Sequence, residues 1–298
     1  KYAVVIPTAG RPAVPRTDET ECEYRMERTG TNGQPPDRPY WLQRICVAGM
    51  AAGVGALLLS KFGLIPLPPW GVFSTMLILI PALLLAFLAQ AGMKNAYNKY
   101  SKVRTQAGIP ASQAAQKILY DNGNNEVSVA RGQGTLTDHY DPRTQVLSLS
   151  EGVYNSASIA AIGIAAHEAG HAMQKKEGYA PLAIRSVVVP AVNFGSMLSV
   201  PIFILGLIMS WQPLVAAGIV LFSLTVAFAL ITLPVEFNAS RRAIAMLNGS
   251  GLITQEEEKG VRKVLNAAAM TYVASAIGAL LQLVRLILLS RGSSSRRD

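Results

Sequence analysis

Long apolar runs alternate with polar stretches along this chain, and several of the runs are long enough to cross a membrane. Residues 72–91 contain no charged side chain, and a transmembrane helix needs about 20 such residues. Residues 186–235 are also uncharged, and the Ser-Trp-Gln-Pro sequence at 210–213 is typical of a turn with an interfacial Trp. The pattern therefore predicts one span at 72–91 and a membrane hairpin with spans at 187–210 and 214–234.

A fourth apolar stretch, residues 267–290, predicts another span. It contains Gln282 and Arg285, which would be costly if they faced lipid, so we expect them to face the other helices or to extend to the interface. Residues 46–60 are apolar but Gly-rich and too short for a full span.

The N-terminal part of the chain differs in composition from the rest. Residues 1–40 are rich in Pro, Gly, Arg, Thr and Glu and lack apolar periodicity, which predicts disorder. We therefore expect an atypical N-terminal extension at residues 1–63 and a membrane domain at residues 64–298.

A polar insert, residues 92–185, separates the first span from the hairpin. Residues 126–150 alternate apolar and polar positions on both sides of an Asp-Pro turn, which predicts a short β hairpin. Helices are expected at 92–107, at 111–121, and from a cap at Asn155 or Ser156 through Gln174. The predicted fold is mainly α, an integral membrane protein with a small α+β region beside the membrane.

Composition and charge support a membrane protein over a nucleic-acid-binding protein. Only 15% of the residues are charged, where soluble domains average roughly 25%. The net charge is +9, but the Lys and Arg residues flank apolar runs, as they do when they orient a protein in a membrane. Cys22 and Cys46 lie outside every motif, so a Cys-rich metal site and a disulfide scaffold are not expected.

The chemistry concentrates in Ala-His-Glu-Ala-Gly-His-Ala, residues 166–172. In a helix, His167 and His171 lie one turn apart on one face and can bind one cation, while Glu168 is rotated by about 100° and lies beside that cation. This is the HExxH arrangement of zinc peptidases. The alternative is a helix that merely carries polar residues, but such residues on an Ala- and Gly-rich helix would be costly to bury unless they bound something.

A catalytic zinc site needs a third protein ligand. His139 is the remaining histidine, but Glu236 is the stronger candidate, because it follows the uncharged hairpin at the point where the chain returns to the side of the His167–His171 helix. The alternative for Glu236 is an ordinary glutamate at a membrane boundary.

Several longer motifs surround these residues. They are NKYSKVRT, LTDHYDPRTQVLSLSEGVYN, SIAAIGIAAHEAGHAMQ, GYAPLAIRS, LPVEFNASRRA and KVLNAAAMTYVASAIGALLQLVRL. Through them the chain resembles the YugP-like neutral zinc metallopeptidases, which are bacterial membrane proteins, over about residues 72–291.

The resemblance implies one zinc ion per chain, bound by His167, His171 and Glu236, with Glu168 as general base. It also implies a likeness to gluzincins, in which an Asp one turn after the ligand Glu orients a ligand histidine. This chain has Ser240 at that position, so Asn238, Ser240 or Asp138 is expected to support a ligand instead.

The expected activity is that of a zinc endopeptidase acting on peptides or membrane proteins. The candidates for stabilising the oxyanion are His139, Tyr140, Tyr154 and Arg241, or the metal alone. The edge of a strand at 145–150 could hold an extended substrate. A non-catalytic zinc-binding scaffold or assembly factor is the alternative. A transporter is disfavoured, because the hairpin has no ionisable group.

Charge also predicts the orientation in a bacterial cell membrane. Positive charges in the insert include Lys94, Lys99, Lys102, Arg104, Lys117, Lys175, Lys176 and Arg185, whereas the turn near Trp211 has none. The positive-inside rule then places the insert in the cytoplasm. The basic tail after residue 290 departs from the rule if residues 267–290 cross completely.

Overall fold

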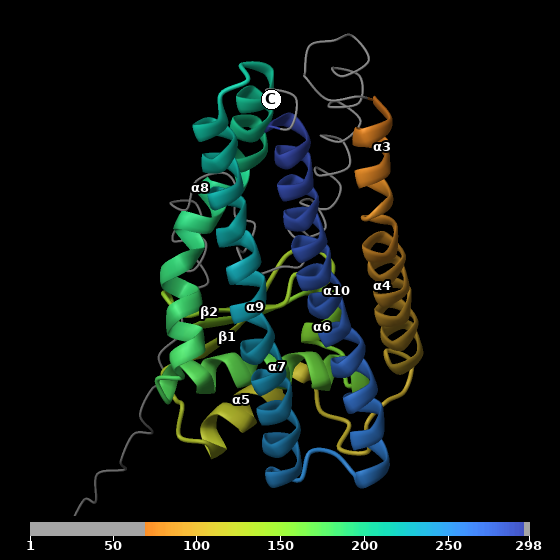
Figure 1. The fold of residues 1–298 in the computed structure, drawn as a ribbon. Coiled ribbons are helices and arrows are strands. Elements are labelled where there is room, and N and C mark those ends of the chain that lie inside the picture. The colour runs from red at the N-terminus through yellow and green to blue at the C-terminus, as the bar shows by residue number, and fades with distance from the viewer. Residues whose placement is uncertain (1–68, 295–298) are drawn as a thin grey trace, which may run out of the picture. The chain divides into compact units, whose positions relative to one another are not determined.

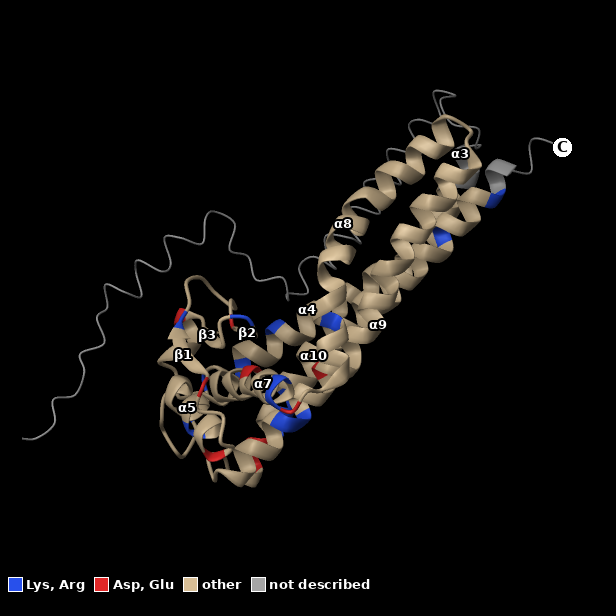
Figure 2. Ribbon diagram, turned by 90° about the vertical axis from the view of Figure 1, so that its left-hand side faces the viewer, with Lys and Arg blue, Asp and Glu red and all other residues tan. Residues whose placement is uncertain are grey.

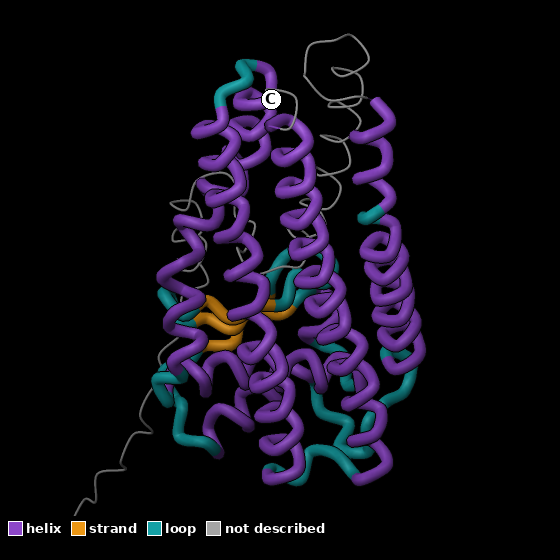
Figure 3. The backbone as a smooth tube through the Cα atoms, in the orientation of Figure 1, coloured by secondary structure: helices purple, strands orange, loops and turns teal. Residues whose placement is uncertain are grey.

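The computed structural model describes residues 69–294. The N-terminal extension expected at 1–63, with its disordered stretch and the short apolar run at 46–60, lies outside the described residues. Four helices of the described part are long and apolar enough to span a membrane. As Figure 1 shows, they stand side by side in the order α8, α9, α10 and α4, and Figure 3 shows how little of the chain is strand. The structure is therefore mainly α, as the sequence predicts.

The first span is interrupted, which the sequence analysis did not predict. It consists of α3, Pro69–Leu77, and α4, Ile80–Tyr100. Pro81 has no backbone N–H to donate and its ring would clash with the carbonyl of Leu77, so it fits only in the first turn of a new helix. The helical segment expected at 92–107 is confirmed only as far as Tyr100, because residues 92–100 are the end of α4 and not a separate helix.

At the predicted hairpin the structure has two apolar helices joined by a short turn, α8, Ala180–Ile208, and α9, Gln212–Gly249. The chain turns at Ser210, which has a φ of 51°. The two helices pack closely: a Cβ on Gly218 would lie 2.7 Å from the Cβ of Phe203. Only glycine therefore fits at this crossing point.

The fourth span is the long helix α10, Gln255–Ser294. A capping box starts it, in which Thr254 Oγ1 accepts from the backbone N–H of Glu257 and the Glu257 carboxylate accepts from the backbone N–H of Thr254. Gln282 and Arg285 are each 2% exposed, and Arg285 donates to Gln282 at 3.5 Å. They face the other helices, which is one of the two positions expected for them.

The insert contains a three-stranded sheet rather than a hairpin alone. The strands are β1, Ser128–Arg131, β2, His139–Asp141, and β3, Val146–Leu149. β2 and β3 form the predicted antiparallel pair, and β1 adds to β3 in parallel, giving the order β1-β3-β2. Because β3 is the central strand, the expectation that 145–150 offers a free edge is wrong, and β2 is the edge strand beside the site.

Three helices complete the insert. They are α5, Ala111–Asp121, α6, Glu151–Tyr154, and α7, Ile159–Lys176. α7 is capped by Ser158, whose hydroxyl accepts from the backbone N–H of Ala161. The cap expected at Asn155 or Ser156 is therefore wrong by two or three residues, because the short helix α6 uses the preceding stretch.

The core of the insert also includes the ends of two spans. α5, β3 and α7 share one buried cluster with the parts of α9 and α10 that follow residue 242 and precede residue 266. Figure 2 shows the charged residues gathered around this end of the molecule, while the rest of the spans is almost uncharged. The insert is thus fixed to the membrane helices by a common core, and this arrangement positions the site.

Candidate metal centre and active site

The candidate metal ligands come from two helices that cross. α7 provides His167 and His171, and α9 provides Glu236. Glu236 Oε2 lies 3.2 Å from His167 Nε2 and 3.7 Å from His171 Nε2, and all three ligand atoms lie within 4.8 Å of one another. The structure therefore brings together the three residues that the sequence singled out as ligands.

A glycine inside the histidine motif allows the two helices to approach. A Cβ on Gly170 would lie 2.6 Å from the carbonyl oxygen of Ala239, so any larger residue would push α9 away from α7. Ala169 on α7 and Ala243 on α9 are fully buried near this contact. Small residues thus place Glu236 next to the histidines.

The three donors fit a zinc ion. Zinc takes imidazole nitrogen and carboxylate oxygen at about 2.0–2.1 Å, so ligand atoms in a tetrahedral site lie roughly 3.3 Å apart. The distances from Glu236 Oε2 to the two histidines are close to this value. Within the described residues no other group of three such side chains is gathered.

A hydrogen-bond chain makes Nδ1 of His171 a hydrogen-bond donor. Gln174 Nε2 donates to the carbonyl of Val235 at 2.8 Å and to Asn238 Oδ1 at 2.9 Å. The amide oxygen of Gln174 must then be the atom 3.0 Å from His171 Nδ1, so Nδ1 carries the proton. Nε2 is therefore the nitrogen that faces Glu236, at 3.7 Å, and that is available to bind a metal.

His167 is supported by a different partner. Its Nδ1 lies 3.1 Å from the hydroxyl of Ser240. Ser240 therefore lies where the resemblance implies an Asp, and it offers His167 a neutral hydroxyl in place of a carboxylate. Asn238 Oδ1 accepts from Gln174 Nε2 and, at 2.7 Å, from Arg242 Nε, so it supports His171 through Gln174. Asp138 accepts from the backbone and hydroxyl of Ser150.

Two residues of the site were missed by the sequence analysis. Gln174 is fully buried, and Arg185, which is 5% exposed, donates to Glu236 Oε1 at 3.1 Å. One oxygen of Glu236 thus faces the arginine and the other faces the histidines. The available signals were that Arg185 is the last charge before the uncharged run and that Gln174 follows His171 at helical spacing.

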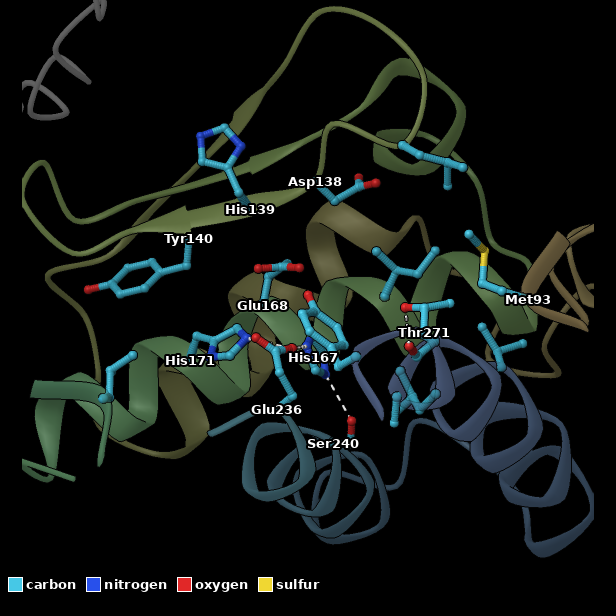
Figure 4. A pocket seen from close by; sticks show the side chains of 18 of the residues that line it. Met93, Asp138, His139, Tyr140, His167, Glu168, His171, Glu236, Ser240 and Thr271 are labelled. Carbon is cyan, nitrogen blue, oxygen red and sulfur yellow. Dashed lines mark hydrogen bonds and ion pairs between the residues drawn. The ribbon is translucent and has the colours of Figure 1, made fainter. Parts of the chain in front are cut away.

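A pocket opens beside the three candidate ligands and contains Glu168. In Figure 4, the carboxylate of Glu168 extends from α7 toward β2, while Glu236 reaches the histidines from α9. Glu168 therefore lies beside the ligand group, as expected for a base.

The oxyanion candidates divide into two pairs. His139 and Tyr140 line the pocket, whereas Tyr154 packs against the core of the insert and Arg241 is exposed, and neither of these lines the pocket. Figure 4 shows Tyr140 on the α7 side of β2 and the His139 ring on the other side. Burial, with the charges of Asp141 and Glu126, raises the pKa of Tyr140, so its hydroxyl can donate at neutral pH.

Comparison with known proteins identifies the family. The model of a family described as "putative neutral zinc metallopeptidase" matches residues 75–291. The chain belongs to this family. A relative from Bacillus subtilis (strain 168), "Putative membrane protease YugP", is 47% identical over 210 residues, which make up 70% of this chain and 93% of the relative. No solved structure matches the chain significantly.

Membership of the neutral zinc metallopeptidase family implies zinc as the metal and a peptide as the substrate. The four apolar helices and the membrane relative agree that this family member is a membrane protein.

Proposed function

We propose that the chain is a membrane-bound zinc endopeptidase, in which His167, His171 and Glu236 hold one zinc ion and Glu168 is the general base. The proposal is carried by the convergence of three zinc-type donors from α7 and α9 at the wall of a pocket that also contains Glu168. A catalytic zinc site has three protein ligands and one open position. A fourth protein ligand, which would favour a structural role, is not gathered here among the described residues.

The residues of the chain have separate tasks in this proposal. Zinc, when bound, supplies a Lewis acid that polarises the scissile carbonyl and acidifies the attacking water. Glu168 accepts a proton from that water and delivers it to the leaving amine. Arg185 occupies one oxygen of Glu236, which leaves the other for the metal. Tyr140 is the best placed donor for the oxyanion, with His139 second.

The edge strand β2 is proposed to hold the substrate. One side of β2 pairs with β3, and residues 138–140 line the pocket above α7. An extended peptide can add to such an edge through backbone hydrogen bonds. This would lay the scissile bond between β2 and the histidines.

Removal of zinc tests this function directly. The purified full chain in detergent should contain about one zinc per chain, and a chelator should abolish cleavage of a library of short peptides. Stoichiometric zinc should restore cleavage, whereas Mg²⁺, which prefers oxygen ligands, should not. Metal content is measured by elemental analysis and cleavage by mass spectrometry. Zinc at one per chain with no peptide cleaved would favour the non-catalytic scaffold.

We also propose that the catalytic end faces the cytoplasm. Figure 1 places the turn between α8 and α9 at the end of the spans away from α5 and α7. The turn near Trp211 has no positive charge, whereas the insert has many, so the positive-inside rule favours a cytoplasmic insert.

Thiol labelling in whole cells tests the orientation. Cysteines would be placed at Asn125 in the insert and at Gln212 in the turn, both exposed positions, after Cys22 and Cys46 have been replaced by Ser. An impermeant maleimide should label position 212 and should label position 125 only after the cells are lysed. Labelling of 125 but not 212 in intact cells would place the peptidase on the outer face.

A further inference from the structure

The pocket that holds the candidate catalytic residues is shared between the insert and the spans. All four spans contribute to its wall, and α9 contributes Glu236 and Ser240. α4 contributes Gln90, Met93 and Tyr97, α8 contributes Leu182, Ser186 and Val189, and α10 contributes residues between Val264 and Tyr272. A pocket meant for soluble peptides alone would not need walls from four membrane helices.

The two outer spans both line this pocket but do not pack extensively against each other. α4 packs against α10, and α8 packs against α9, while in the part of the chain that the structure describes no extensive interface joins α4 to α8. Figure 1 shows the consequence: α8 and α4 are the two ends of the row of spans. The side of the pocket between α4 and α8, which we call the gap, is bordered by residues of both helices.

The polarity of the gap indicates what passes through it. The pocket face of α8 continues from Ser186 and Val189 to Asn193 at helical spacing, and Asn193 is exposed although it lies in the uncharged span. Facing lipid chains alone, this amide would lack partners, which is costly. A polypeptide offers backbone carbonyl and N–H groups to pair with it. The gap is therefore suited to a polypeptide more than to an acyl chain.

The depth of the pocket fixes where a substrate would be cut. Lys94 lies within the pocket-lining stretch of α4, and Arg185 precedes the uncharged part of α8, so the pocket lies where the spans leave the membrane. The stretch from Gln90 to Tyr97 is about 10 Å long in a helix, and an extended chain covers that in about three residues. The cleaved bond would be close to the end of an apolar segment.

We propose that the substrates are membrane proteins, whose apolar spanning segment enters between α4 and α8 and is cleaved within about five residues of its end. The proposal rests on the peptidase function proposed above and specifies its substrate class. The occupant of the gap is thus a polypeptide segment delivered from the bilayer.

A pair of substrates tests the class. One is a short soluble peptide that the protein cleaves, and the other carries the same sequence fused to an apolar segment of about 20 residues. With the full chain in lipid nanodiscs, we expect kcat/KM to be at least about tenfold higher for the anchored form, because insertion raises its effective concentration. The advantage should fall as the cleavage sequence is moved away from the apolar segment by Gly-Ser spacers.

Closing the gap tests the route. Ala86 lies one turn from Gln90 on α4. In a variant that carries Cys22→Ser and Cys46→Ser, the substitutions Ala86→Cys and Asn193→Cys place one thiol on each side of the gap. A bifunctional thiol reagent with a reducible spacer should slow cleavage of the anchored substrate at least about tenfold, because that substrate loses its local concentration at the site. Cleavage of the soluble peptide should change by less than about twofold, and reduction of the spacer should restore the rate.

The outcomes separate the two proposals. The single-cysteine variants, treated in the same way, control for modification of either helix. If neither substrate is cleaved before cross-linking, the peptidase function fails. If both are cleaved equally, or the cross-link slows both equally, the peptidase stands and entry from the bilayer is wrong.

Discussion

Glu168→Gln is expected to lower the rate of peptide cleavage by about 100-fold or more, since general-base catalysis contributes at least that factor. The amide has almost the same shape as the carboxylate but cannot accept the proton of the attacking water. Glu168 is not one of the three gathered ligands, so zinc content should stay near one per chain. The measurements are kcat with a soluble peptide, zinc by elemental analysis, and melting temperature.

The control for this substitution is Glu256→Gln. Glu256 is a surface glutamate whose side chain is 82% exposed and forms an ion pair with Lys259, so its loss should change neither kcat nor zinc. Glu168→Asp gives a second comparison, because it keeps a base but moves it away from the water. More than a few per cent of the parent activity in Glu168→Gln would show that another group accepts the proton, and Tyr140 and His139 would then be the first to examine.

The spans could be predicted because their signal is local. An uncharged run of sufficient length favours a helix inside a membrane, and α8 and α9 follow from that alone, whereas α10 follows from an apolar run that still contains Arg285. The break before Pro81 was missed, since a proline inside an apolar run does not show whether it bends a helix or starts a new one. The pairing of β1 with β3 was missed because the alternation of β1 carries no information about a partner strand farther along the chain.

The candidate site also has parts that the sequence predicts and parts that it does not. The spacing of His167 and His171 is a property of one helix, so the sequence contains it. The approach of Glu236 could be inferred only from the return of the hairpin and from the resemblance. The contacts of Arg185 with Glu236 and of Gln174 with Val235 join residues 51 and 61 positions apart, and they depend on how closely α7, α8 and α9 pack. No periodicity in the sequence reports such contacts.

Glu236→Gln is expected to reduce zinc affinity by about 100-fold or more. Loss of a residue that only hydrogen-bonds a metal ligand already reduces metal affinity by about 10–100-fold. A neutral amide oxygen is a weaker ligand than a carboxylate, and Arg185 would also lose the charge that it contacts at 3.1 Å. Ser240→Ala removes only the contact with His167 Nδ1, so its effect on affinity should be smaller. Competition with a zinc chelator of known affinity measures both.

A second variant separates loss of a ligand from loss of the fold. Glu236 is 2% exposed, and removing a buried charge beside Arg185 could unfold the chain rather than empty the site. Glu236→Asp keeps the charge near Arg185 but draws the oxygen back from the histidines, so it should retain the parent melting temperature in the metal-free form and still bind zinc more weakly. If both Glu236 variants fold and hold zinc as tightly as the parent, Glu236 is not a ligand. His139 or Asp138, which line the same pocket, would then be the candidates for the third donor.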